Sequence, residues 1–248
     1  MTRSGTRTHT GSFFLKNLPL ILVTLMQVAL WQRSKDIKPD LIILAEVPGK
    51  YEVKALSFGD DEFYFRVLGG QVQMAGDTFG RATPLKDYDY VKLLAWFRLL
   101  DGLDEKSNYI PALAAYYYSN TQRASDNKYI IEYLEENAAR DPEQKWWWLA
   151  QAAMIAKYRL HDKEKALEIA RRLSAIPGDL PIWARQLPAF LYADMGEKEQ
   201  AIIIIRDILK NYKNLPPEEL NFMYYFVKDR LKMLVPEELR EQKKEIPR

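Results

Sequence analysis

The sequence predicts an all-α protein in which helical pairs stack behind one apolar N-terminal helix and a short extended segment. Apolar residues recur at helical spacing from residue 57 almost to the C-terminus, and no strand pattern competes with them there. One segment of the chain also repeats after 35 residues. Because each helical pair buries its apolar side only against a neighbour, a repeat of this length favours a linear array.

Composition argues against most catalytic chemistries. The chain has 248 residues, no cysteine and two histidines. A disulfide framework, a thiolate nucleophile and a Cys-ligated metal site all need thiols. A histidine-based metal site or catalytic triad would rest on His161 alone, because His9 lies in a polar tail. We therefore expect no catalytic residues, no metal site and no cofactor.

Charge is distributed unevenly along the chain. Five of the 36 basic residues and none of the 34 acidic ones lie within residues 1–35, which leaves 31 basic against 34 acidic residues in the rest. Nucleic-acid binding draws most of its affinity from a basic surface. The body of the chain lacks an excess of basic residues, so we expect no nucleic-acid partner. Separately, we expect no small-molecule substrate.

Residues 13–33 are interpreted as a transmembrane signal anchor that follows a polar tail, residues 1–12. The run from Phe13 to Trp31 would just cross a bilayer as a helix. Lys16 at one end and a tryptophan at the other suit the two membrane interfaces. The residues expected to anchor the chain are Phe13, Phe14, Leu20, Ile21, Leu22, Leu25 and Trp31.

Two alternatives to an anchor are a cleaved signal peptide and a buried helix of a soluble domain. Cleavage is disfavoured because the bulky Trp31 stands where a small residue is needed.

A short tail without acids usually stays in the cytosol. We therefore expect a single-pass protein of the bacterial inner membrane with its body in the periplasm.

Residues 34–56 are expected to form an extended linker or strap. The segment Lys38–Asp40 would break a helix, Pro48-Gly49 favours a turn, and apolar and polar residues alternate over residues 51–55. A small hairpin around that turn is the alternative.

Helices fill residues 57–235, which we interpret as one helical repeat domain. The spacing of Ser57 and Asp60 is typical of a helix start, and glycine, proline and aspartate residues separate the later segments. Residues 236–248 are expected to form a charged tail. The expected helices span residues 60–75, 90–103, 109–121, 128–139, 143–160, 163–175, 182–195, 198–212 and 218–234.

The repeat resembles the tetratricopeptide (TPR) hairpin, whose period is roughly 34 residues. Superimposing Asp162–Leu173 on Glu197–Ile208 matches Ala166 with Ala201, and the two segments share Lys, Glu and Arg residues. The small residue lets two helices approach closely, and Gly196 suits a turn with positive φ. Residues at the TPR consensus positions are Tyr192, Gly196, Ala201, Ile205 and Ile208. In the preceding unit His161 replaces the turn glycine.

The chain as a whole is similar to bacterial membrane-anchored TPR-like proteins that carry a Leu-Ser-x-Gly segment, here Leu56–Gly59. The resemblance implies an α-α superhelix whose concave side is lined by the first helix of each pair, and it implies no enzymatic activity. Pro188 departs from the pattern and is expected to kink its helix.

The concave side supplies the candidate partner-binding residues, because stacked helical hairpins commonly hold peptides or partner helices there. These residues are Trp147, Trp148, Gln151, Trp183, Gln186 and Phe190.

Other conspicuous residues have structural explanations. Successive helical residues point about 100° apart, so neither Trp146–Trp148 nor Tyr116–Tyr118 can form one flat platform. Both triplets are expected to be buried with a partly exposed edge, and a ligand-binding face is the alternative. The acidic run Asp60–Glu62 suits the first turn of a helix, and His161 suits the end of one. Gly69-Gly70 predicts close approach of another helix or of the strap.

The sequence therefore predicts a non-enzymatic, membrane-anchored scaffold, assembly factor or accessory subunit of a membrane complex, with protein partners. A periplasmic chaperone-like holdase is the first alternative, because a helical array could hold unfolded chains. A carboxylate-dependent cell-wall hydrolase is the second.

Overall fold

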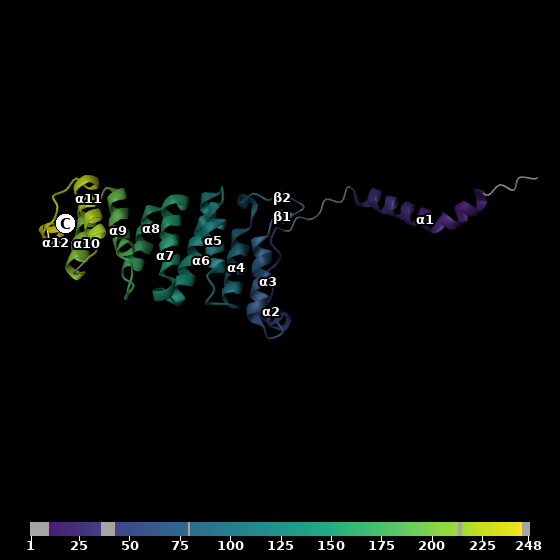
Figure 1. Cartoon of the computed structure of the whole chain (residues 1–248), viewed down its shortest axis with the longest axis horizontal. Coiled ribbons are helices and arrows are strands. Elements are labelled where there is room, and N and C mark those ends of the chain that lie inside the picture. The colour runs from purple at the N-terminus through teal and green to yellow at the C-terminus, as the bar shows by residue number, and fades with distance from the viewer. Residues whose placement is uncertain (1–9, 36–42, 79, 213–214, 245–248) are drawn as a thin grey trace, which may run out of the picture. The chain divides into compact units, whose positions relative to one another are not determined.

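A computed structural model describes residues 10–35, 43–78, 80–212 and 215–244 (Figure 1). It divides into two units, residues 1–42 and 43–248. Parts of the expected polar tail, linker and C-terminal tail lie outside the described residues, namely 1–9, 36–42 and 245–248. The side chains of Phe13 and Phe14 also lie outside this description.

The first unit contains helix α1 (Thr10–Ser34), which covers the expected anchor. Its side chains from Leu18 to Ser34 are all exposed, and Pro19 lies inside it. Within the described ranges, no helix is both long enough and apolar enough to pass through a membrane. Thr24 and Gln27 interrupt the apolar run. The expected spanning anchor is therefore not supported by the described helix.

The second unit is helical, as expected, apart from a two-residue antiparallel ladder between β1 (Asp77–Thr78) and β2 (Arg81–Ala82). Its helices are α2 (Lys50–Leu56), α3 (Asp61–Gln73), α4 (Tyr90–Asp101), α5 (Tyr109–Tyr116), α6 (Asn127–Arg140), α7 (Pro142–Ile155), α8 (Lys163–Ser174), α9 (Ile182–Met195), α10 (Lys198–Asn211), α11 (Pro217–Tyr225) and α12 (Glu237–Lys244). Short 3-10 turns occupy Leu85–Asp87, Tyr118–Asn120 and Ala124–Asp126, and π-helical turns extend α7 over Ala156–Leu160 and α11 over Phe226–Arg230.

Helix α2 corrects the expected strap. The extended segment is confined to the residues before Lys50, where the Trp96 indole donates a hydrogen bond to the carbonyl of Ala45 (2.9 Å). From Gly49 onward the chain turns into a helix, and the amide of Val53 donates to the carbonyl of Gly49 (3.0 Å). Among residues 51–55 only Val53 is buried. A helical turn can bury a single side chain as well as a strand can, so the alternation over these residues did not distinguish the two.

Helix α12 corrects the expected C-terminal tail. Leu239 is fully buried, and the side chain of Gln242 donates a hydrogen bond to the carbonyl of Leu209 in α10 (3.1 Å). One buried leucine among charged residues was too weak a signal to reveal an amphipathic helix of eight residues.

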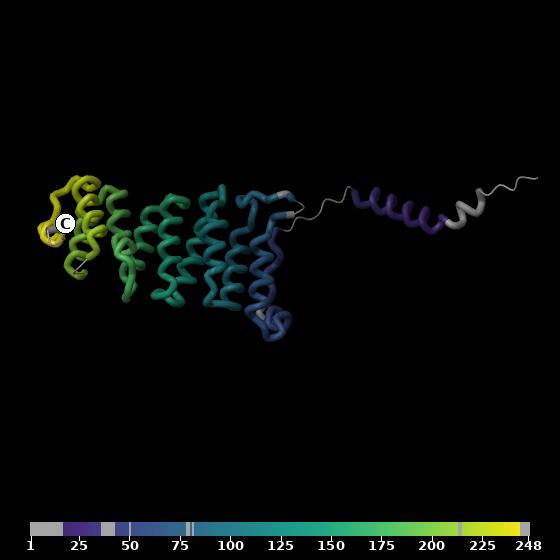
Figure 2. The backbone as a smooth tube through the Cα atoms, in the orientation of Figure 1, coloured from purple at the N-terminus to yellow at the C-terminus, as the bar shows by residue number. Residues whose placement is uncertain are grey.

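The helices of the second unit stand side by side along it (Figure 2). We call α3, α5, α7, α9 and α11 the A helices, and α4, α6, α8, α10 and α12 the B helices. Each helix from α6 to α9 packs against the next in sequence, and α4 and α5 also pack against α6. Ala166 of α8 and Ala201 of α10 are fully buried.

Candidate functional site

The sequence-predicted binding residues divide between the surface and the core. Trp147 of α7 and Trp183 of α9 remain 40% and 37% exposed, and their ring centroids lie 6.0 Å apart. Trp146 is half-buried beside both rings, with a centroid distance of 5.6 Å to each. These edge-to-face contacts join α7 and α9 and leave part of the indole surface open to a partner.

Trp148 and Gln186 are buried, so neither can contact a partner directly. Trp148 follows Trp147 by about 100° around the helix, and its indole donates a hydrogen bond to the side-chain oxygen of Asn108 (2.9 Å). The Gln186 amide is fully buried and donates to Glu219 (3.2 Å). Both residues stabilise contacts between neighbouring A helices.

Phe190 and Gln151 lie nearer the surface. Phe190 is half-buried and packs edge-to-face against Phe222 of α11, with ring centroids 5.5 Å apart. Gln151 is also half-buried and lines a shallow pocket of about 300 Å³ between α5 and α7.

Several exposed residues complete the same surface and were not predicted. The indole of Trp147 donates a hydrogen bond to the hydroxyl of Tyr116 in α5 (2.8 Å), which links three successive A helices in one aromatic row. Along α7 and its π-helical extension, residues 147, 151, 154 and 158 follow roughly the spacing of a single helical stripe, and this spacing could have identified Met154 and Tyr158. We define the aromatic surface as Tyr116, Trp147, Gln151, Met154, Tyr158, Trp183, Phe190 and Phe222.

An ion-pair network lies at one end of this surface. The carboxylate of Asp194 in α9 accepts hydrogen bonds from Lys157, which follows α7, and from Arg230, which follows α11. Burial by itself raises the pKa of Asp194, but these two bonds outweigh that effect and lower the pKa below its usual value. The network therefore holds three successive A helices at fixed spacing.

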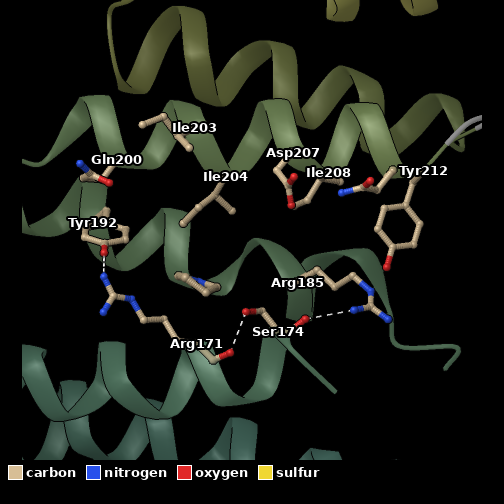
Figure 3. A pocket seen from close by; sticks show the side chains of 12 residues that line it. Arg171, Ser174, Arg185, Tyr192, Gln200, Ile203, Ile204, Asp207, Ile208 and Tyr212 are labelled. Carbon is tan, nitrogen blue, oxygen red and sulfur yellow. Dashed lines mark hydrogen bonds between the residues drawn. The ribbon is translucent and has the colours of Figure 1, made fainter. Parts of the chain in front are cut away.

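A larger pocket of about 640 Å³ opens between α8, α9 and α10 (Figure 3). Its two guanidinium groups are engaged by the fold. Arg171 donates to the hydroxyl of Tyr192, while Arg185 donates to the carbonyls of Ser174 (3.0 Å), Ile176 (3.3 Å) and Gly178 (2.8 Å). Arg185 thus caps carbonyls at the end of α8. The pocket and Trp183 lie on opposite sides of α9.

The conspicuous carboxylates also have structural partners. Asp60 accepts a hydrogen bond from the amide of Phe63 (2.9 Å) and is the N-cap of α3, whereas Ser57 lies at the end of α2 and does not cap α3. Buried Asp101 accepts from the hydroxyl of Tyr133 and the amide of Asn137, both at 2.7 Å, and pairs with Arg140. Burial raises the pKa of Asp101, and these three partners oppose the rise. Among the described residues, no group of three His, Asp or Glu side chains is placed to hold a metal ion.

Comparison with known proteins gives no relative. No protein-family model, curated protein or solved structure matches the chain. Its function is therefore inferred from its own surface chemistry.

Proposed function

We propose that this protein is a non-enzymatic binding platform that holds a segment of a partner protein on its aromatic surface. Tryptophan and tyrosine are the side chains most enriched among the residues that dominate binding energy at protein interfaces. The contiguous row Tyr116–Trp147–Trp183 is the observation that carries this proposal, because it crosses three A helices and remains partly exposed.

The polar groups of the surface favour an extended segment. Gln151 lines the same shallow pocket as the exposed Tyr116 and Tyr158, and an amide side chain can pair with both the N–H and the C=O of a peptide backbone. Apolar side chains of the segment would then pack on the indoles. The resemblance to TPR hairpins supports the same role, which is that of a scaffold, an assembly factor or an accessory subunit.

Membrane attachment through residues 13–33 is part of the proposal. It is supported by the exposed apolar side chains of α1, including Leu20, Leu22 and Leu25. Alkaline carbonate extraction of native membranes distinguishes the possibilities. A chain that stays in the pellet is inserted, whereas release into the supernatant would contradict insertion.

The binding proposal is tested by changing Trp147 and Trp183 to Ala together in the full chain. A matched control changes Val91 and Ile203, which are exposed on the B helices α4 and α10, to Ala. Truncating two central aromatic residues should weaken partner binding at least about tenfold, while circular dichroism and the unfolding midpoint show that the fold persists. Recovery of the partner is quantified by affinity purification and mass spectrometry.

The same measurement separates the alternatives. One partner in fixed stoichiometry, retained by the control and lost by the double variant, supports the platform. Many substoichiometric clients would support a holdase instead, and unchanged recovery with the double variant would exclude the aromatic surface. Hydrolysis of cell-wall material by the purified chain would support the hydrolase.

A further inference from the structure

Helix α3 carries two apolar sides, of which the fold uses only one. Phe65, Leu68 and Val72 are buried against the neighbouring helices. On the opposite side Phe63 is 61% exposed and Met74, the C-cap that directly follows the helix, is 66% exposed, with Val67 partly exposed between them. A helix at the end of a stack is expected to be polar on its outer side, so this second apolar side is not explained by the fold.

The exposed residues form one narrow stripe. Positions 63, 67, 70 and 74 follow the i, i+4, i+7, i+11 spacing that places residues on one line along a helix. Exposed polar residues, among them Glu62, Arg66 and Gln71, flank the line. We call Phe63, Val67, Gly70 and Met74 the outer stripe. By contrast, the exposed residues of α12, at the other end of the stack, include charged Glu237, Arg240 and Glu241.

Gly70 gives the outer stripe a gap. A Cβ atom built on Gly70 would meet nothing within 4 Å, whereas one on Gly69 would lie 3.0 Å from the ring of Tyr109. Packing within the described chain therefore accounts for Gly69 but not for Gly70, although both glycines lower the stability of the helix relative to alanine. A glycine on an otherwise apolar stripe allows another helix to approach closely.

The outer stripe is complementary to itself. When two copies of α3 lie antiparallel about a twofold axis between residues 68 and 69, Phe63 faces Met74 of the second copy. In the same register Val67 faces the gap at Gly70 of the second copy. A thioether against an aromatic ring is a favourable contact, and a twofold axis makes each contact occur twice.

The exposed area near the stripe matches what a dimer needs. Helix α2 lies at the foot of α3 (Figure 1), and the loop between them presents Phe58, which is 93% exposed at a strained φ of 50°. Aromatic side chains offer roughly 150–250 Å² each. The exposed rings of Tyr51, Phe58 and Phe63, with Val67 and Met74, add up to an apolar surface on the order of 700 Å² on and around α2 and α3, against roughly 800 Å² per partner in a standard interface.

From this self-complementarity and area we propose that a second copy of this chain docks antiparallel on the outer stripe and forms a twofold dimer through α3. This contact is independent of the aromatic surface, so the two proposals fail separately.

Because the chain has no cysteine, disulfide trapping can test the register directly. Full chains carrying Phe63→Cys and Met74→Cys, each with a different tag, are co-expressed and the extract is oxidised. We expect a disulfide between the two different chains. Equal residues would stand about 16 Å apart in the antiparallel register, too far for a disulfide. Disulfides between equal residues in comparable yield, or no disulfide at all, would overturn the proposal.

Sedimentation of the full chain tests the strength of the contact. Val67→Glu should weaken self-association at least tenfold, and Gly70→Leu should do the same by filling the gap while favouring the helix. Val91→Glu is the matched control, an equally charged change at an exposed valine of α4, and should leave association unchanged. A wild-type chain that stays monomeric, because a different protein or another segment of the same chain covers the outer stripe, would refute the dimer.

Discussion

His161 and Gly196 hold the same left-handed backbone conformation 35 residues apart, with φ of 62° and 88°. Each residue ends an A helix or its π-helical extension and is followed, one residue later, by the N-cap of a B helix. The turn is therefore a shared feature of the two hairpins, although only one of them uses glycine. Histidine tolerates this conformation better than bulky or β-branched residues do.

The shared turn predicts that substitutions at the two positions change the free energy of unfolding by different amounts. Gly196→Ala should lower the free energy of unfolding by about 1–2 kcal/mol, because a Cβ atom disfavours positive φ although nothing lies within 4 Å of it. His161→Gly should change it by less than about 0.5 kcal/mol, because relief of strain offsets the greater entropy of the unfolded chain. Urea unfolding of both variants measures the difference. Equal losses would contradict a common turn.

Adjacent glycines in α3 should also respond differently to alanine. Gly70→Ala should stabilise the chain by about 0.5–1 kcal/mol through helix propensity. Gly69→Ala should be less stable than Gly70→Ala by at least about 1 kcal/mol, because its Cβ would press on Tyr109. Thermal unfolding at low protein concentration compares the two. Equal stabilisation would show that Tyr109 yields without cost.

Asp194→Asn should make the free energy of unfolding depend less on pH in the acidic range. Its charged hydrogen bonds to Lys157 and Arg230 lower the pKa of Asp194 in the folded chain. A lowered pKa stabilises the fold above the usual value near 3.8, and the stabilisation is lost as the pH falls through the folded-state pKa.

The expected loss for Asp194→Asn is about 1–2 kcal/mol at pH 7, and it should shrink as the pH falls below 3.8 to pH 3 and lower. Denaturant unfolding of both chains across this range provides the measurement. If the difference in unfolding free energy between the two chains is the same at pH 3 as at pH 7, the network contributes through packing and not through charge.

Asp101→Ala should be the most destabilising of these changes. It leaves Tyr133 and Asn137 without their buried acceptor and removes the partner of Arg140 (3.0 Å). Breaking a buried ion pair from one side costs about 3–5 kcal/mol. Glu46→Ala removes the partner of Lys92 at the surface and should cost less than about 0.5 kcal/mol. Similar losses in guanidinium unfolding would contradict the role of burial.

Local patterns identified most of the helices. Segments with a full apolar side, such as α8 and α10, were located within two residues of their observed ends, because amphipathic spacing and caps act over a few residues. Short helices were missed where only one buried apolar residue marked them. Val53 alone marked α2, and Leu239 alone marked α12.

The candidate site was only partly predictable for the same reason. The sequence pattern correctly placed Trp147 and Trp183 near a surface, but it also placed Trp148 and Gln186 there, and both are buried. Whether a side chain one position along a helix is buried depends on the neighbouring helices, which lie distant in sequence. Asn108 and Glu219, the partners that hold these two residues inside, carry no local signal of that role.

The sequence by itself determined the helical class, the 35-residue repeat and the small residues that let helices approach, because each depends on spacing within one or two helices. Only the tertiary structure decided which aromatic rings stay exposed, which ion pairs join the A helices, and that α3 presents a second apolar side. Those features depend on which surfaces remain after all the helices have packed, and burial is a property of the whole assembly.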